Sequence, residues 1–463
     1  MTAEPLAMPA SPPPWRDVLA GTQGRLIVGL LVLETLFALH FMTVATIMPA
    51  VLKDLGNLAL YGWSFTAASL GQLGVIPIAG AAVDRFGPRR ILAMVATLYT
   101  VGLLVAASAP TMAVVAGGRF LQGIAAGAAY ALSLGVVAKA LPARHRARVM
   151  ALLATTWLLP GLFGPPLGAL LAETVGWRYA FIVPLPVLAA CLVMIMPSLR
   201  GIAVAEAGAV PLARPLLLMV GAGAFFAGLT APGTLSIPVA LAGLAIAVVA
   251  LRGLVPDGTF RAARGPAAAA VAAFLLSTSF VAAENFLPLM FTDVRGRTLT
   301  EVAIVLAVIP FTWAAGSWWQ SRAVEHRPPS TLVTVGGALV LLGFGTSASG
   351  LVPGVPLWLA YAGWPVAATG MGIAFPTIPL AVMSWVREGA EGRELSPTLL
   401  MDMVGVALGA GLAGASLAIA DRSGASLTAG LGGAFAVSGV ASLFLLMVAR
   451  RISVGPPATR LPD

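Results

Sequence analysis

Residues 80–90 read Gly-Ala-Ala-Val-Asp-Arg-Phe-Gly-Pro-Arg-Arg and form a short basic interruption between two apolar runs. Gly80 permits close contact between helices, and Asp84 can cap a helix N-terminus or pair with an arginine. Gly87 and Pro88 force a tight turn, because glycine adopts turn conformations freely and proline ends the helix that precedes it. Two apolar helices joined by a tight, positively charged turn are therefore predicted here.

The composition of the whole chain is that of an integral membrane protein. Of its 463 residues, 59% are hydrophobic and only 10% are charged, whereas soluble domains carry about 25% charged residues. The formal charge of +9 does not indicate a nucleic-acid partner, because the basic residues are not clustered in a stripe. The single cysteine, Cys191, leaves no disulfide framework or thiolate metal cluster available.

Apolar stretches long enough to cross a membrane recur along the chain. Each can cover a hydrocarbon core of about 30 Å at about 1.5 Å per residue of helix. The two middle stretches are the shortest and are rich in glycine, so a re-entrant hairpin is the alternative for that pair. The fourteen predicted spans are residues 25–51, 62–83, 90–109, 111–138, 147–172, 177–197, 212–230, 236–252, 265–291, 299–320, 330–349, 355–384, 397–420 and 425–449.

Positive charge gives the orientation of these spans. Cytoplasmic loops hold an excess of lysine and arginine, and with the N-terminus inside, most arginines between the predicted spans fall on the cytoplasmic side. An even number of helices is favoured, because an odd number would invert every later loop and remove this bias. We therefore expect a multi-pass protein of the inner (plasma) membrane with both termini in the cytoplasm. The basic residues left outside are Lys53, Arg178, Arg295, Arg297 and Arg422.

Two internal echoes indicate that the chain consists of two related halves. The first span ends in a Pro49-to-Gly56 pattern that returns, one residue longer, between Pro288 and Gly296. Glycines at 123 and 127 in the fourth span are matched by glycines at 370 and 372 in the twelfth, as expected for transporters built from repeats. Chance similarity between apolar helices is the alternative. The predicted division is a cytoplasmic N-terminal tail at 1–24, a six-helix bundle at 25–197, a linker at 198–263 with an inserted helix pair at about 212–252, a second six-helix bundle at 264–450 and a cytoplasmic tail at 451–463.

At the basic turn the chain resembles the major facilitator superfamily. The signature of that family in this loop, G-x3-D-R/K-x-G-x-R/K-R/K, is matched at every defined position. The resemblance implies an all-α membrane fold of two six-helix bundles, here with an extra two-helix insertion. It also implies that the acid and the arginine of the loop hold the two halves closed at the cytoplasmic face. The residues that would form this gate loop are Gly80, Asp84, Arg85, Gly87, Arg89 and Arg90.

Ionisable residues inside the predicted spans are candidates for proton coupling. Arg119 and Gln122 belong to a stretch that resembles the family's R-x-x-Q-G motif, and a charged arginine inside a membrane requires a buried partner or an aqueous cavity. A neighbouring arginine favours a charged carboxylate, burial favours the neutral acid, and alternating access can switch which effect dominates. Glu34 is the candidate acid, although His40 stands where the drug:proton antiporters carry theirs. A static ion pair at Arg119 and a histidine satisfied by a backbone carbonyl are the alternatives.

The fifth and sixth spans carry two further resemblances. Prolines and glycines in the fifth span, at Gly161, Gly164, Pro165 and Gly168, resemble the antiporter motif of proton-driven drug exporters in an imperfect register. Proline bends the helix and glycine lets a neighbouring helix approach the bend. A kinked packing helix without directional meaning is the alternative. Residues 176–181 resemble the start of the sixth helix in the fourteen-helix drug:proton antiporter family.

In the second half, Glu284 is a carboxyl within the ninth span and could bind a cationic substrate or carry a proton. For Asp402, five residues into the thirteenth span, an interfacial charge at a helix N-terminus is at least as strong an interpretation as a functional carboxyl. Polar and aromatic side chains that could line a substrate cavity are Gln122, Trp157, Phe280, Asn285 and Trp313.

The function expected from these features is secondary active transport. The resemblance implies proton-coupled antiport that exports a lipophilic or cationic amphiphilic small molecule by alternating access, driven by the proton gradient without a cofactor or metal. We expect a monomer whose partners are the substrate, protons and the lipid bilayer. The alternatives are an exporter of a lipid or endogenous metabolite and a non-transporting membrane sensor. An enzyme is not expected, because three histidines and one cysteine supply no nucleophile or metal constellation.

Overall fold

The computed structural model describes residues 21–140, 149, 152–153, 156–200, 212–385 and 391–453. Every regular element in these ranges is helical. Most of the two predicted tails lies outside the described residues. We call the end of the molecule at which the first helix begins the inner end, and the opposite end the outer end, after the predicted topology.

Helices occupy the described parts of all the predicted spans. The first half contains α2 (Gly21–Leu55), α3 (Trp63–Phe86), α4 (Pro88–Ala107), α5 (Met112–Ala140), α7 (Leu158–Thr174), α8 (Tyr179–Ile182) and α9 (Pro184–Ser198). The middle pair is α10 (Ala213–Thr230) and α11 (Ser236–Arg252). The second half contains α12 (Pro266–Glu284), α13 (Leu287–Leu289), α14 (Leu299–Leu306), α15 (Ile309–Ala323), α16 (Pro329–Ser347), α17 (Leu357–Met383), α18 (Glu391–Arg422) and α19 (Leu427–Ala449). Short turns of other helix types are η1 (Leu58–Leu60), η2 (Thr259–Arg261), η3 (Met290–Val294) and η4 (Ala348–Leu351).

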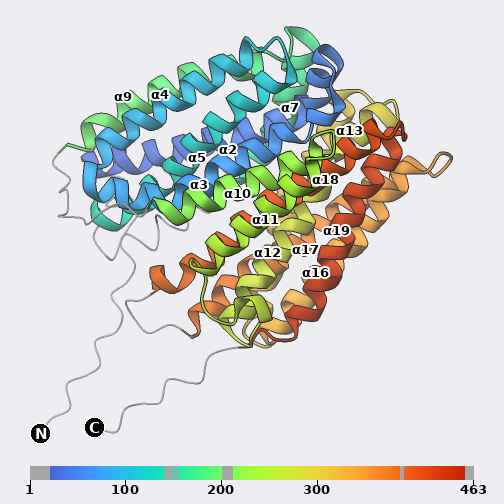
Figure 1. The fold of residues 1–463 in the computed structure, drawn as a ribbon. Coiled ribbons are helices and arrows are strands. Elements are labelled where there is room, and N and C mark those ends of the chain that lie inside the picture. The colour runs from blue at the N-terminus through green and yellow to red at the C-terminus, as the bar shows by residue number, and fades with distance from the viewer. Residues whose placement is uncertain are drawn as a thin grey trace, which may run out of the picture.

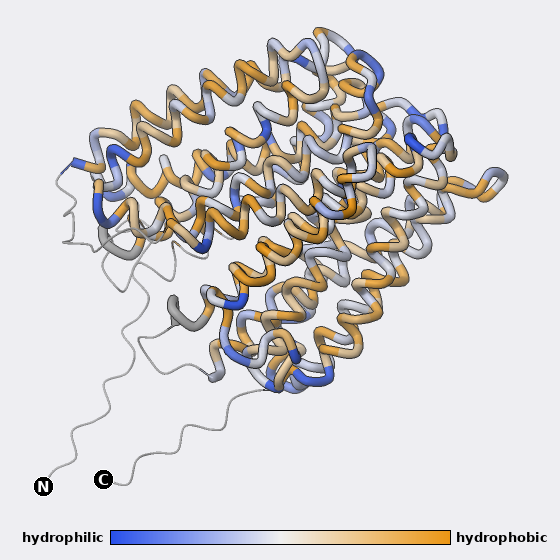
Figure 2. Tube along the Cα trace, viewed as in Figure 1, coloured by the Kyte–Doolittle hydropathy of each residue, from blue (hydrophilic) through white to orange (hydrophobic). Residues whose placement is uncertain are grey.

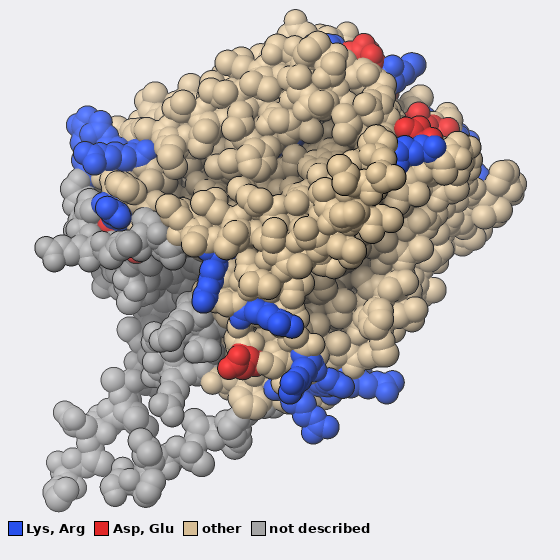
Figure 3. Space-filling view, in the orientation of Figure 1, with Lys and Arg blue, Asp and Glu red and all other residues tan. Residues whose placement is uncertain are grey.

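Twelve helical stretches within the described residues are long and apolar enough to cross a membrane. The predicted count of fourteen is not confirmed, because α7 and α11 have 17 residues each and reach only about 25 Å. Hydrophobic residues follow the helices along most of their length, and hydrophilic residues gather near their ends (Figure 2). On the face shown in Figure 3, lysine, arginine and acidic residues lie at the two ends, and an uncharged belt separates them. The chain is therefore a multi-pass membrane protein.

The helices form two bundles with the middle pair beside them (Figure 1). In the first bundle α2 packs against α7 and α9, and α5 packs between α3 and α4. In the second, α12 packs against α18 and α19, and α17 lies between α15 and α16. Helix α10 contacts α11, α3 and α18, so the middle pair touches both bundles.

Glycines allow the closest helix crossings, and they do so at matching places in the two halves. A Cβ atom added at Gly123 on α5 would collide with the backbone of Ala68 on α3. In the second half, a Cβ atom at Gly372 on α17 would collide with the carbonyl of Trp313 on α15. The glycine echo seen in the sequence thus corresponds to equivalent backbone contacts, which only a residue without a side chain permits.

The two bundles meet at their outer ends. Gly62, before α3, lies against Gly414 on α18 so closely that neither position has room for a Cβ atom. Glu173 at the end of α7 accepts hydrogen bonds from the backbone N–H (3.1 Å) and the hydroxyl (2.6 Å) of Thr300 at the start of α14. The ribbons of the two bundles spread apart toward the inner end (Figure 1). The conformation is therefore one in which the outer ends are joined.

Candidate functional site

The basic turn between α3 and α4 has the predicted geometry. Gly87 has a φ of 82°, and its N–H donates to the carbonyl of Val83 over 3.1 Å, which ends α3. Pro88 then begins α4. The prediction that Gly80 permits a close contact between helices is wrong in this conformation, because a Cβ atom there would meet nothing within 4 Å. The roles of Asp84, Arg85, Arg89 and Arg90 as a gate stay predictions; the three arginines are exposed and Asp84 is half-buried.

Arg119 is buried in the outer half of the first bundle. Its side chain is 3% exposed. The Nε group donates to the carbonyl of Ser64 over 3.2 Å, and Nη1 donates to Oε1 of Gln122 over 2.8 Å. The amide nitrogen of Gln122 donates in turn to the carbonyl of Gly102 over 2.9 Å, which holds α5 against α4. Nη2 of Arg119 has no hydrogen-bond partner among the described residues.

This network corrects the prediction that Gln122 lines a substrate cavity. Gln122 is only 2% exposed, and both ends of its amide are engaged within the bundle. Its amide thereby holds the guanidinium of Arg119 in place. The sequence motif indicated that the two residues act together, but not that the glutamine faces the arginine.

His40 on α2 has a partner that the sequence did not reveal. Its Nδ1 atom lies 2.7 Å from the hydroxyl of Tyr99 on α4, and its Nε2 atom is buried without a partner among the described residues. The rings of Phe181 and Tyr99 both meet the imidazole edge to face. The alternative of a histidine bound to a backbone carbonyl is therefore wrong. The positive charge of Arg119 also acts on the imidazole of His40, so these two residues lie in the same part of the first bundle.

Glu34 lies in a different region of the first bundle. Its Oε1 atom accepts a hydrogen bond of 2.7 Å from the hydroxyl of Ser133 on α5. Ser133 comes fourteen residues after Arg119 on the same helix, which is about 21 Å along its axis. The predicted pairing of Glu34 with Arg119, and the static ion pair offered as its alternative, are both wrong. The carboxyl and the arginine lie toward opposite ends of the bundle.

Asp402 is a second buried carboxyl in the inner half. Of its two interpretations, the interfacial charge at a helix N-terminus is wrong, because α18 begins at Glu391, eleven residues earlier, and Asp402 is 8% exposed. It accepts a hydrogen bond from the hydroxyl of Ser277 on α12. The charges of both Asp402 and Glu34 reach Tyr130 on α5. One carboxyl from each bundle therefore lies within electrostatic range of this tyrosine.

Glu284 sits at a break in the first helix of the second bundle. Helix α12 ends at Glu284, a turn follows at Asn285, and the chain continues through α13 and the π-helix η3. Glu284 has no hydrogen bond or ion pair among the described residues. The side-chain oxygen of Asn285, which is 1% exposed, also lacks a partner among them. Breaks of this kind in membrane helices occur where the backbone is buried in protein or lines a cavity, and π-helical turns are frequent at functional sites.

An aromatic cluster lies one helical turn before Glu284. Phe280 is stacked on Trp364 with ring centroids 5.4 Å apart, and it meets Trp313 (5.7 Å) and Phe344 (5.4 Å) edge to face. The indole nitrogen of Trp364 is buried without a hydrogen-bond partner among the described residues. Because residues four apart share a helix face, Glu284 and Phe280 project to the same side of α12. Phe280 and Trp313 thus lie together with Trp364 and Phe344, two residues that the sequence analysis did not single out, and the place of Phe280 and Trp313 in a substrate cavity stays a prediction.

The fifth predicted span has the close contacts expected of its glycines. Cβ atoms added at Gly164 or Gly168 on α7 would strike α2, and the hydroxyl of Thr43 on α2 donates to the carbonyl of Gly164 over 3.2 Å. A Cβ atom at Gly161 would strike Pro310 of the other bundle. Pro165 lies between these glycines, inside the helix. Trp157, which precedes the helix, is 53% exposed and lies apart from the Phe280 cluster, with its ring near Phe41 (6.3 Å).

The sixth span begins with a contact that the sequence did not reveal. Asp54 at the end of α2 accepts hydrogen bonds from Nε1 of Trp177 (3.0 Å) and from Nη1 of Arg178 (2.7 Å). Trp177 is 5% exposed and therefore belongs to the protein core. The acid in the Pro49-to-Gly56 pattern thus fastens α2 to α8.

Comparison with known proteins places these features in a family context. A model of the Major Facilitator Superfamily matches residues 30–393. The chain is 27% identical over 452 residues to a probable multidrug-efflux transporter of Mycobacterium tuberculosis strain H37Rv, covering 93% of this chain and 95% of that protein. It is 35% identical over 178 residues to a multidrug resistance protein B homolog of the same strain, covering 37% and 33% of the two chains.

Solved structures share the fold. An auto-inhibited peptide transporter of the POT family matches with a TM-score of 0.69 at 16% identity, covering 94% of this chain and 99% of that one. A D-xylose-proton symporter matches with a TM-score of 0.68 at 12% identity, covering 95% of this chain and 100% of that one. At these identities the likeness concerns the fold alone.

Proposed function

This chain belongs to the Major Facilitator Superfamily, and we propose that it exports a lipophilic or cationic amphiphilic small molecule in exchange for protons. Such an exporter would be a multidrug or antibiotic efflux transporter that works by alternating access. The similarity to a probable multidrug-efflux transporter over 93% of the chain supports this direction of transport.

The observation that carries the proposal is the unpaired carboxyl of Glu284 beside the aromatic cluster. A charged carboxylate at a helix centre costs about 2.5–3.5 kcal/mol on the insertion scale, and no cation among the described residues offsets that cost. Either a proton or a cationic substrate can neutralise the carboxyl. Because one site cannot hold both, the two ligands compete, and that competition is the requirement for antiport. Aromatic faces such as those of Phe280 and Trp313 attract organic cations and apolar groups.

The first bundle supplies further proton sites in the proposal. Glu34 would take up and release a proton at the inner half, where its hydroxyl partner Ser133 can donate to the carboxylate. In the outer half, His40 would take up and release a proton during the same transport cycle, close to the fixed positive charge of Arg119. Arg119 is then an electrostatic and positioning residue, since no carboxylate pairs with it among the described residues.

The proposal also covers topology and gating. We infer fourteen spans, with α7 and α11 crossing as the two shortest, in the inner membrane with both termini cytoplasmic. The two six-helix bundles would comprise residues 25–197 and 264–450, with the linker and its inserted helix pair at 198–263 between them. Asp84 and Arg85 would join the bundles at the inner ends in the opposite conformation, when the contacts of Glu173 and Thr300 at the outer ends have opened. The protein would act as a monomer.

The test is dye efflux in everted membrane vesicles with and without a pH gradient. Wild-type protein should move an amphiphilic cationic dye only when the gradient is present. Glu284→Gln keeps the shape and removes the charge, so it should abolish gradient-dependent transport of the cation. Asp293→Asn is the matched control, because Asp293 is an exposed carboxyl nine residues along the same segment. Unchanged gradient-dependent transport by Glu284→Gln would refute the assignment.

The second candidate is an exporter of a lipid or endogenous metabolite. The scarcity of charged side chains in the spans favours it, because a neutral apolar cargo needs no counter-ion. Vesicles loaded with a neutral fluorescent lipid distinguish the two candidates. Transport of the neutral lipid that persists in Glu284→Gln, without transport of the cationic dye by wild type, would support this second candidate. A non-transporting sensor would show neither flux.

A further inference from the structure

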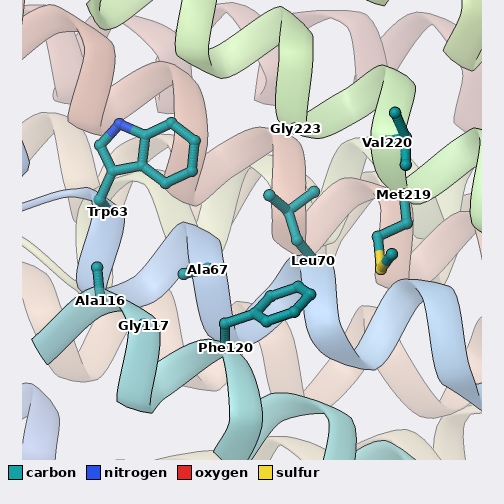
Figure 4. Close-up of a pocket in the computed structure, with 9 residues that line it drawn as sticks. All are labelled: Trp63, Ala67, Leu70, Ala116, Gly117, Phe120, Met219, Val220 and Gly223. Atoms are coloured by element: carbon teal, nitrogen blue, oxygen red, sulfur yellow. The ribbon is translucent and has the colours of Figure 1, made fainter. Parts of the chain in front are cut away.

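A groove of about 390 Å³ opens on the side of the first bundle, between α3, α5 and α10 (Figure 4). Its walls carry no charged side chain. The indole of Trp63 stands at one end, and Leu70, Phe120 and Met219 approach one another at the other end (Figure 4). The lining residues are Trp63, Ala67, Leu70, Ala116, Gly117, Phe120, Met219, Val220 and Gly223.

The groove faces the surroundings of the protein. Val220 on α10 is 57% exposed, and Gly117 on α5 is exposed with nothing within 4 Å of a Cβ atom built on it. A Cβ atom at Gly223 would be 3.7 Å from Leu70. Small residues on α5 and α10 therefore keep a space open that larger side chains could fill without a clash.

The groove fits within one leaflet of the bilayer. It extends from Trp63, the first residue of α3 at the outer end, to Leu70, seven residues further. This is about 10 Å along the helix, compared with about 15 Å for half of the hydrocarbon core. At this depth the surrounding medium is lipid hydrocarbon.

We propose that this groove holds one acyl chain of a glycerophospholipid of the outer leaflet, seated between the first bundle and the inserted helix pair. The site is separate from Glu284 and does not depend on the transported substrate. The bound chain fills the space that α10 leaves against α3 and α5, and it thereby joins the inserted pair to the bundle.

Polar groups at the outer end of the groove suit the rest of such a lipid. Nε1 of Trp63 donates to the hydroxyl of Thr230 over 3.0 Å, at the end of α10. Nη1 of Arg422 donates to the carbonyls of the same Thr230 (2.6 Å) and of Ala231 (2.5 Å). Nη2 donates to the carbonyl of Leu229 (3.0 Å), which leaves Nε and one N–H of Nη2 for an anion. A tryptophan and an arginine thus meet at one residue, at the depth where an indole prefers the interface and a guanidinium can attract a phosphate.

Retained lipid is the first measurement. Full-length protein is extracted from nanodiscs of phosphatidylglycerol and phosphatidylethanolamine, and the phospholipid that remains bound is counted by native mass spectrometry. Gly117→Leu fills the groove and should reduce the retained phospholipid by one molecule per chain. Gly345→Leu on α16 is the matched control, since Gly345 is also an exposed helical glycine with nothing within 4 Å of its built Cβ atom. Equal retention in both variants would overturn the proposal.

Tryptophan quenching locates the lipid. Protein is reconstituted with phosphatidylcholine that carries a brominated acyl chain and is then diluted into unlabelled lipid. The difference in emission between wild type and Trp63→Phe isolates the signal of Trp63 in the groove. The difference between wild type and Trp358→Phe isolates the signal of Trp358, which reports bulk lipid because Trp358 is 68% exposed at the outer end of α17. Quenching of Trp63 should outlast that of Trp358 at least severalfold, and Gly117→Leu should abolish the difference.

Two outcomes would contradict the assignment. If the quenching of Trp63 disappears as fast as that of Trp358, no chain is retained in the groove. If a transported cationic dye displaces the brominated chain from Trp63, the groove belongs to the substrate path and the lipid assignment fails. Both measurements are made without a pH gradient, so the failure of the proposed antiport would not affect them.

Discussion

Replacement of Gln122 by methionine tests the polar network around Arg119. Methionine is unbranched and similar in length, so the change removes the amide while it nearly keeps the volume. Nη1 of Arg119 loses its 2.8 Å acceptor, and the carbonyl of Gly102 loses its 2.9 Å donor. A hydrogen bond to a charged group contributes about 1.5–3 kcal/mol and a neutral one about 1 kcal/mol. We expect Gln122→Met to lower the free energy of unfolding by about 3 kcal/mol.

Gln320 on α15 provides the opposite case in the same protein. It is 3% exposed, and its amide nitrogen has no hydrogen-bond partner among the described residues. Removal of an unpaired buried amide relieves a desolvation cost. Gln320→Met should therefore leave stability unchanged or raise it. Both variants are unfolded in mixed micelles of increasing SDS content, and helix content is followed by circular dichroism. Equal losses of stability would refute the hydrogen-bond argument.

Three further results are expected from contacts in the outer half and from the tightest helix crossing. Arg422→Ala removes the donors that cap the end of α10, so amide exchange there should accelerate about tenfold for each 1.4 kcal/mol lost, as measured by hydrogen–deuterium exchange. Gly123→Val collides with α3 and should yield almost no folded protein, whereas Gly432→Val, with nothing within 4 Å of its built Cβ atom, should be produced normally. Thr300→Val removes the hydroxyl donor to Glu173, and a loss of up to about 1 kcal/mol would enlarge the outward-open population up to about fivefold, as measured by distances between spin labels. An unchanged exchange rate, equal yields or an unchanged distance distribution would contradict the respective argument.

Local features of the sequence were sufficient to predict the helices and the basic turn. Apolar length predicts a membrane helix because every backbone group must be paired within lipid. The Gly87-Pro88 turn follows from the backbone preferences of those two residues alone. Even the glycine echo carried over into equivalent close crossings at Gly123 and Gly372, because the absence of a side chain has the same consequence wherever helices cross.

The sequence did not predict which polar side chains on different helices pair with each other. Glu34 and Arg119 were expected to pair. In the structure the carboxyl of Glu34 instead accepts a hydrogen bond from Ser133, and Arg119 lies near His40 and its partner Tyr99. Positions along a helix give a depth for each residue. They do not give the rotation of that helix about its axis or the identity of its neighbour, which packing against several other helices decides.

The amino-acid sequence by itself determined that this is a multi-pass helical membrane protein of the transporter superfamily, since hydropathy, charge bias and the loop motif are each written in consecutive residues. The tertiary structure decided which polar groups share a site: the unpaired Glu284 with its aromatic cluster, and the apolar groove between α3, α5 and α10. The reason is that a site is a set of distances between helices distant in sequence, and those distances depend on how side chains of all the helices fill space together.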